Sequence, residues 1–173
     1  RLHGVKRFIS NAGIAQIYIV FASTTPGAKA KGISAFIVPA DAPGITVKEK
    51  TRLLSPHPIG VLGFVDCFVP QQQRLGNEGD GLNIAYRTLD TLRSTVGAAA
   101  VGFARRALAE AISYSRSRRQ FGRPIGDFQG IQFKIAEMAA DLEAARLLVY
   151  QAAWAHDMHH PELPLKSSIA KVF

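Results

Sequence analysis

The residues best suited to chemistry lie between Tyr114 and Ala139, where arginines gather at a predicted bend. The arginines are Arg116, Arg118, Arg119 and Arg123. An aromatic-glycine pair, Phe121-Gly122, lies among them, and the sequence Pro124-Ile125-Gly126 predicts a turn. A bend between two helices does not need four arginines, and guanidinium groups bind phosphate through paired hydrogen bonds. The corner is therefore a candidate anion site, with phosphate as the usual ligand.

A purely structural explanation of these arginines stays open. Cations are favoured at the C-terminal end of a helix by the helix dipole, so Arg116 and Arg119 could simply solvate such an end. Arg118 is harder to explain in this way because it adjoins the aromatic-glycine corner. A second predicted helix starts with Asp127 as its N-cap, and the free N–H groups of that helix end would also favour phosphate.

Other candidate sites are weaker. The glycine-rich stretch Gly76–Gly81 does not follow a strand of a βαβ unit, so it predicts a flexible entry to a helix rather than a phosphate loop. The spacing of His156, His159 and His160 fits one helix face, but Pro161 follows and no carboxylate or cysteine completes a ligand set. We therefore expect no metal. The other histidines, His3 and His57, have no nucleophile partner recognisable from sequence.

Composition limits the class of protein. The chain has 173 residues, of which 47% are hydrophobic and 20% charged, typical of one or two globular domains. It contains no apolar run of the length needed to span a membrane. The single cysteine, Cys67, lies in an apolar run and predicts a buried structural thiol in a reducing compartment. Because the chain begins without methionine and ends inside an apparent helix, we expect a fragment.

The net charge of +8 is concentrated rather than spread. Between Arg105 and Arg123 there are six arginines and one acid, Glu110. Charge confined to one corner favours a small phosphate ligand over a long nucleic acid.

Two kinds of periodicity divide the chain. Short runs rich in Ile, Val, Phe and Tyr, separated by turn residues, predict strands. These runs are Lys6–Ile9, Gln16–Ala22, Ile33–Val38, Ile45–Lys48 and Gly60–Val69. From Gly81 the apolar residues recur with a helical period, which predicts a first helix that ends near Arg118. A second helix is predicted from Asp127 to about His156. Pro161 and Pro164 should bracket a loop, after which a third helix starts at Lys166.

The expected fold is therefore α+β with two domains. Residues 1–75 should form a small antiparallel β-barrel or sandwich, and residues 76–173 part of an up-down helical bundle. The second strand is apolar on both faces for part of its length, so we expect it to be central. The run of small residues from Val96 to Gly102 should let a neighbouring element approach the first long helix closely.

The order and spacing of several segments resemble the acyl-CoA dehydrogenase family along essentially the whole chain. The β part resembles the middle domain and the helical part resembles the start of the C-terminal four-helix domain. The matching segments are Lys6–Ala12, Gly32–Val38, Pro43–Ile45, Val101–Ala104, Arg118–Gly122, Phe128–Gln132 and Ala136–Ala139. No single segment is decisive, but together they are highly specific.

The resemblance implies an oxidoreductase that uses FAD to desaturate an acyl-CoA thioester between its α and β carbons. Its partners would be the acyl-CoA substrate, an electron-transfer flavoprotein, and a second copy of itself in a homodimer or homotetramer. We expect no nucleic-acid partner, because the charge excess is confined to one corner, and no membrane partner, because the chain has no apolar run long enough to span one. The resemblance implies a location in the bacterial cytoplasm or, in a eukaryote, the mitochondrial matrix, and the sequence does not decide between them. The length and branching of the acyl chain stay open.

The resemblance also assigns roles to individual residues. Phe8, Ile9 and Ser10 would lie beside the flavin ring, with the Ser10 hydroxyl near N5. A partner subunit's FAD would be held by Arg118, Gln120, Phe121, Phe128 and Gln129. Asp90 and Arg93 would contact the CoA part of the substrate, although an ordinary helix ion pair has the same i, i+3 spacing.

Some features depart from the family pattern. None of the 173 residues resembles the family's N-terminal helical domain. No catalytic base is found either: a minority of members carry a glutamate where this chain has Leu92, and Leu92 cannot abstract a proton. We therefore expect the base beyond Phe173. The stretch Ser55–Gly60 also differs from the common pattern. Two alternatives remain, a flavin oxidase or monooxygenase on the same scaffold, and a nucleic-acid-binding relative with vestigial activity.

Overall fold

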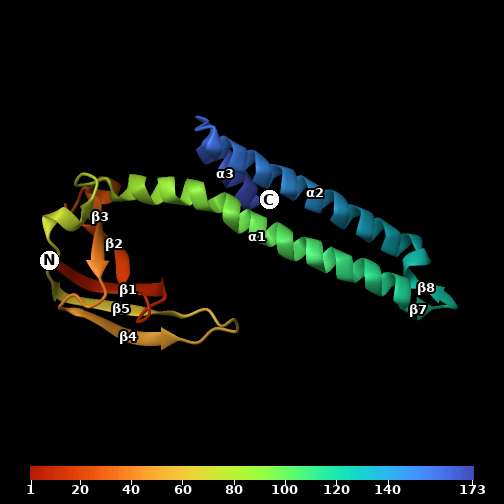
Figure 1. Cartoon of the computed structure of the whole chain (residues 1–173), viewed down its shortest axis with the longest axis horizontal. Coiled ribbons are helices and arrows are strands. Elements are labelled where there is room, and N and C mark those ends of the chain that lie inside the picture. Colours follow the sequence, from red (N-terminus) through yellow and green to blue (C-terminus); the bar gives the residue numbers. More distant parts are fainter. The chain divides into compact units, whose positions relative to one another are not determined.

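A computed structural model describes all residues, 1–173, and they form two compact units. The first unit is Arg1–Tyr86 and the second is Arg87–Phe173. The chain passes from strands to helices as expected, which confirms the α+β class (Figure 1).

The first unit contains two antiparallel sheets, each of three strands. In one sheet the order is β1 (Leu2–Ser10), β5 (Ile59–Cys67) and β4 (Ile45–Thr51). In the other the order is β2 (Ile17–Ser23), β3 (Ile33–Pro39) and β6 (Arg74–Leu75). The five predicted strands are all present. A barrel or a sandwich was predicted for them, and the structure has two separate antiparallel sheets that do not close into a barrel.

Both sheets contribute to one core. Leu62 and Phe64 of β5 and Val38 of β3 are almost fully buried and belong to one hydrophobic cluster with Tyr18 and Val20 of β2. The expectation that β2 is central was wrong, because β2 pairs only with β3. Its two faces differ: Tyr18 and Val20 are buried, while the alternating Ile17 and Ile19 are exposed. A run of apolar residues shows that a strand is hydrophobic, but it does not show how many strands pair with it.

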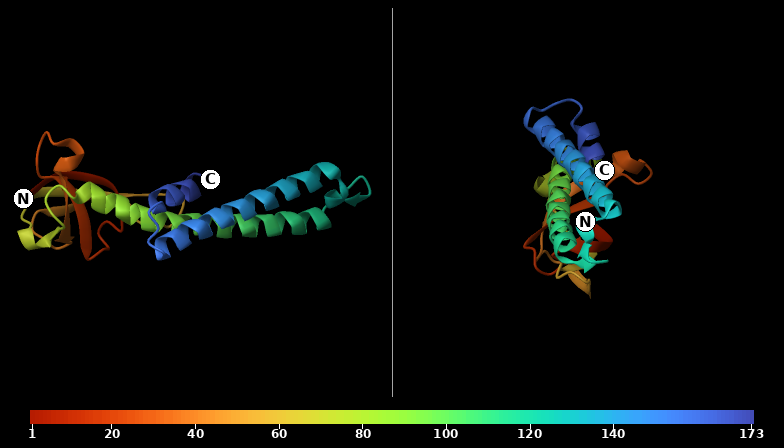
Figure 2. Two further views of the ribbon diagram at one scale, coloured as in Figure 1. Left: turned by 90° about the horizontal axis from the view of Figure 1, so that it is seen from above. Right: turned by 90° about the vertical axis from the view of Figure 1, so that its right-hand side faces the viewer.

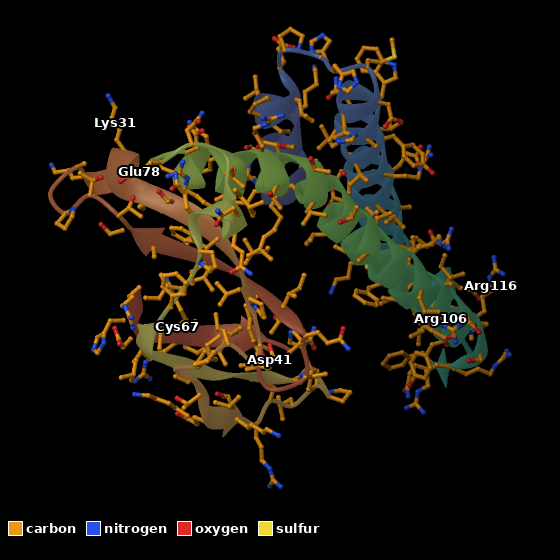
Figure 3. The ribbon with its side chains drawn as sticks, turned by 60° about the vertical axis from the view of Figure 1, so that its left-hand side comes forward. Lys31, Asp41, Cys67, Glu78, Arg106 and Arg116 are labelled. Atoms are coloured by element: carbon orange, nitrogen blue, oxygen red, sulfur yellow. The ribbon has the colours of Figure 1, made fainter.

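Cys67, labelled in Figure 3, ends β5 inside this core and is fully buried, which confirms the predicted buried thiol. Burial raises the pKa of the Cys67 thiol because the thiolate would lose its hydration. We expect Cys67 to resist alkylation in the native protein and to react only when β5 opens. Mass spectrometry after iodoacetamide treatment, with and without urea, checks this. Rapid labelling without urea would contradict the buried position.

The second unit is built on long helices. α1 (Gly81–Ser117) and α2 (Gln129–Asp157) are joined by a small β-hairpin, and α3 (Leu163–Val172) packs against α2 (Figures 1 and 2). None of the helices is both long and apolar enough to cross a membrane. The predicted end of the first helix near Arg118 is confirmed.

Two local predictions in this unit were wrong. Asp127 is not the N-cap of α2, because it closes a single 3-10 turn, Ile125–Asp127, and Phe128 takes the cap position without a side-chain hydrogen bond. Pro164 does not bracket a loop, because α3 already begins at Leu163. Proline fits the first turn of a helix, where its missing N–H would have no intrahelical acceptor.

The expected close approach to the small-residue run occurs at Gly97. A Cβ atom there would lie 2.8 Å from Cγ2 of Val149 and 3.4 Å from the carbonyl oxygen of Ala170. Val149, Ala152 and Ala170 form the buried cluster of this unit. Glycine at position 97 therefore allows α1 to pack closely against α2 and α3, while Gly102 has no neighbour at that distance.

Candidate functional site

The hairpin between α1 and α2 has a strained tip. Its strands are β7 (Arg119–Gln120) and β8 (Arg123–Pro124), and the two turn residues Phe121 and Gly122 have φ values of 50° and 80°. Positive φ at both positions is typical of a type I′ turn, where glycine costs nothing and phenylalanine costs about 1 kcal/mol. The Phe121 ring gains no burial in return, since the residue is 92% exposed. The tip therefore keeps an aromatic ring in solvent at an energetic cost.

The arginines around this tip have no carboxylate partners. Arg116, Arg118, Arg119 and Arg123 form no ion pair, whereas Arg106, earlier on α1, lies 2.6 Å from Glu110 (Figure 3 labels Arg106 and Arg116). Nη2 of Arg119 donates only a long bond of 3.5 Å to the Gly122 carbonyl. No carboxylate therefore lies within ion-pair distance of these four arginines, which favours an anionic ligand at the hairpin.

Arg118 is held by its backbone while its side chain remains free. Its N–H donates to the Tyr114 carbonyl and its carbonyl accepts from the Ile125 N–H, both at 2.8 Å. The residue is exposed and its guanidinium has no hydrogen-bond partner. A fixed backbone with a free guanidinium is suited to paired hydrogen bonds with phosphate.

A groove of about 450 Å³ runs beside the tip. Its lining residues are Gln120, Phe121, Ile125, Phe128, Gly130, Ile131 and Lys134. The Phe121 and Phe128 rings meet edge to face with centroids 6.1 Å apart, and the Arg123 guanidinium lies 4.2 Å from the Phe128 ring centroid. The groove thus combines flat apolar walls with adjacent cations.

The structure brings together several residues that the sequence singled out. Gln120, Phe121 and Phe128 line the groove, while Gln129 is exposed at the first residue of α2. Lys134 was missed, although the signal was available: it lies four residues after Gly130, which places both on one face of α2. Its ammonium adds one more cation to the site.

A second set of candidate residues lies in the β unit, at the end of β1. The pairing of β1 with β5 shifts register between Lys6 and Ile9, and Phe8 has φ 56° with 76% of its surface exposed. A bulge of this kind redirects a side chain out of its normal alternation. Ile9 is half-buried against the core and Ser10 is exposed. The result is an exposed aromatic side chain two residues from an exposed hydroxyl.

Ser10 has a partner that sequence reasoning missed. Its Oγ lies 3.0 Å from Nε2 of His57, a residue 47 positions further along the chain. Pairing of Ser10 with Ile59 in the β1–β5 ladder brings the two side chains together. The contact could have been predicted only from the register of β1 against β5, which cannot be derived from the sequence alone.

Asp90 and Arg93 connect α1 to α3. Nη1 of Arg93 lies 2.7 Å from Oδ1 of Asp90 and 3.1 Å from Oγ of Ser168, and Ser167 donates to the same Asp90 oxygen at 3.3 Å. The side chains are only 26% and 13% exposed for Arg93 and Asp90, respectively. The pair is therefore an i, i+3 ion pair with a structural role in attaching α3, and the other two guanidinium nitrogens of Arg93, Nε and Nη2, have no partner within the chain. Leu92, between them, is half-exposed.

Comparison with known proteins gives a consistent result. Residues 1–66 match the family profile described as acyl-CoA dehydrogenase, middle domain, and residues 79–173 match acyl-CoA dehydrogenase, C-terminal domain. An acyl-CoA dehydrogenase of Bacillus subtilis (strain 168) is 47% identical over 176 residues, which cover 99% of this chain and 46% of the relative. The chain thus spans about half the length of the curated relative.

Solved structures agree. Butyryl-CoA dehydrogenase from Megasphaera elsdenii is 44% identical with a TM-score of 0.91, covering 97% of this chain and 44% of that one. The FAD complex of PigA is 34% identical with a TM-score of 0.86, covering 98% of this chain and 48% of that one.

Proposed function

Since the chain belongs to the acyl-CoA dehydrogenase family, we propose that the full-length protein is an FAD-dependent enzyme that desaturates an acyl-CoA thioester between its α and β carbons. The observation that carries this proposal is the hairpin tip. It holds an exposed aromatic ring at a backbone cost beside four arginines without carboxylate partners. The fold does not need four unpaired arginines at this tip, and cations beside aromatic rings suit a dinucleotide.

The residues fit the chemistry of FAD. A dinucleotide offers a pyrophosphate, which needs cations and hydrogen-bond donors, and flat rings, which need apolar faces. Arg118 supplies a cation and hydrogen-bond donors for the pyrophosphate, and the groove walls at Phe121 and Phe128 supply apolar faces for the rings. Gln120 and Gln129 add side-chain amides for the polar edges. In the proposal this hairpin holds the FAD of a partner subunit, so that the enzyme works as a homodimer or homotetramer.

The β1 segment fits the redox end of an FAD molecule, the flavin ring. When bound, FAD would supply the hydride acceptor, at N5 of its flavin ring. Phe8 and Ile9 would cover the ring and exclude water, and the Ser10 hydroxyl would donate a hydrogen bond at N5. A carboxylate base would take the α-proton, the bound FAD would supply the acceptor for the β-hydride, and an enoyl thioester would remain.

This chain's own residues contribute binding rather than proton abstraction. Leu92 has a hydrocarbon side chain and cannot act as the base, so we propose that a carboxylate elsewhere in the full-length protein does. The unpartnered nitrogens of Arg93, on a side chain that Asp90 holds in place, would contact the CoA part of the substrate. An electron-transfer flavoprotein would reoxidise the enzyme, in the bacterial cytoplasm or the mitochondrial matrix.

Flavin content tests the proposal. The full-length protein should purify yellow, with flavin absorbance that denaturation releases as FAD, or should gain this absorbance on reconstitution. A folded protein that stays colourless and takes up no FAD would reject the proposed function.

Phe121 at the hairpin tip should lower the stability of the helical unit and strengthen the binding of FAD. In Phe121→Asn the turn keeps its shape with a residue that tolerates positive φ, so the helical unit should gain about 1 kcal/mol of unfolding free energy. FAD should bind about tenfold more weakly, because a stacking face of the groove is lost. Urea unfolding and fluorescence titration with FAD measure the two effects. Stability and affinity falling together would contradict the account of Phe121.

A further inference from the structure

His57 is placed against Ser10 by a stiff segment. The Asn11 N–H donates to the Pro58 carbonyl at 2.9 Å, and the His57 N–H donates to the Ser55 carbonyl at 2.8 Å. Proline on either side, Pro56 and Pro58, restricts the backbone, since each fixes its own φ and the residue before a proline is confined to extended conformations. The imidazole therefore reaches Ser10 from a backbone with little freedom, in the stretch that departs from the common family pattern.

The contact controls where the Ser10 hydrogen can point. A hydroxyl has one donor and two acceptor positions. When Nε2–H of His57 donates to Oγ, the hydroxyl hydrogen cannot lie along that line and is turned away from the imidazole. A hydroxyl that already accepts a hydrogen bond is also a stronger donor, because hydrogen bonds in a chain polarise one another.

We propose that His57 is a positioning residue that orients the Ser10 hydroxyl as a donor toward N5 of the flavin. This inference rests on the proposed function, because it takes Ser10 to lie beside the flavin ring. Nε2 of a neutral imidazole donates in one tautomer and accepts in the other, so the positioning role requires the tautomer of His57 that carries its proton on Nε2.

A serine and a histidine at this distance could also form a nucleophile and base. Such a pair requires a third group that orients the base. Nδ1 of His57 has no partner in the structure. The geometry therefore favours orientation of the hydroxyl over hydrolysis.

The test uses full-length protein loaded with FAD labelled with ¹⁵N at N5. The variants are Ser10→Ala, His57→Leu, His57→Gln and the double variant Ser10→Ala/His57→Leu. The control is His3→Leu, which removes a histidine from β1, the strand that carries Ser10. The ¹⁵N resonance of N5 reports its hydrogen bond directly. In addition, the ¹⁵N resonances of His57 in the flavin-free protein should change in Ser10→Ala.

We expect His57→Leu to move the N5 resonance in the same direction as Ser10→Ala, and the double variant to move it no further than Ser10→Ala. Anaerobic flavin reduction should slow about tenfold in His57→Leu, the loss expected for one hydrogen bond. His57→Gln, whose amide reaches the position of Nε2, should restore both values, and His3→Leu should change neither.

Three results would overturn the inference. An unchanged N5 resonance in His57→Leu would reject the positioning role while leaving the flavin enzyme intact. Covalent labelling of Ser10 by a fluorophosphonate, lost in His57→Leu, would assign the pair to hydrolysis. A protein that binds no FAD would reject the proposed function and this inference with it.

Discussion

Replacing Arg118 with alanine should weaken FAD binding about 30-fold, equivalent to about 2 kcal/mol, the value of a hydrogen bond to a charged group. The guanidinium of Arg118 has no partner within the chain, so its removal leaves no buried group unsatisfied. The fold should therefore be unaffected, because the Arg118 backbone bonds to Tyr114 and Ile125 remain. Titration of the flavin-free full-length protein with FAD measures the affinity, and circular dichroism checks the helices.

Arg105→Ala is the matched control for this variant. Arg105 is another exposed arginine of α1, about four helical turns before the hairpin, and its removal lowers the net charge by the same amount. If Arg105→Ala weakened FAD as much as Arg118→Ala, the effect would be long-range charge and not a specific phosphate contact. Unchanged affinity in Arg118→Ala would reject the assigned role.

Leu62→Ala should destabilise the β unit by about 3 kcal/mol, as expected for a fully buried leucine that leaves a cavity. Leu62 is 1% exposed, lies on the central strand β5 and joins the core shared by both sheets. Hydrogen exchange of the β5 amides measures the opening free energy, and the rate of Cys67 alkylation gives an independent value for the same strand.

Val65→Ala is the control for Leu62→Ala. Val65 is on the same strand but 57% exposed, so the substitution should cost less than about 1 kcal/mol. Equal losses in the two variants would mean that the shared core is not where the structure places it.

Much of the fold was predictable because local patterns determine it. Runs of β-branched and aromatic residues broken by turn residues gave five strands, and the change of period at Gly81 gave α1. The number of neighbours of a strand is not a local property. This is why β2, apolar on both faces in part, was wrongly expected to be central. Asp127 was wrongly taken for the N-cap of α2 because its residue type fits that role, whereas the 3-10 turn Ile125–Asp127 leaves the cap position to Phe128.

The site was predictable to the extent that it is contiguous. The hairpin residues lie within twenty positions, so their composition already indicated an anion site. The contact between Ser10 and His57 depends on the register of β1 against β5, and the interaction of Asp90 with Ser167 depends on the packing of α3 against α1. Neither arrangement has a signal in residue spacing.

Anaerobic titration of the flavin-loaded full-length protein with an acyl-CoA tests the central claim most directly. The visible flavin absorbance should bleach, and one equivalent of the α,β-unsaturated thioester should appear for each flavin reduced. A flavin that binds but remains oxidised in the presence of short-, medium- and long-chain acyl-CoA thioesters would contradict the proposed reaction.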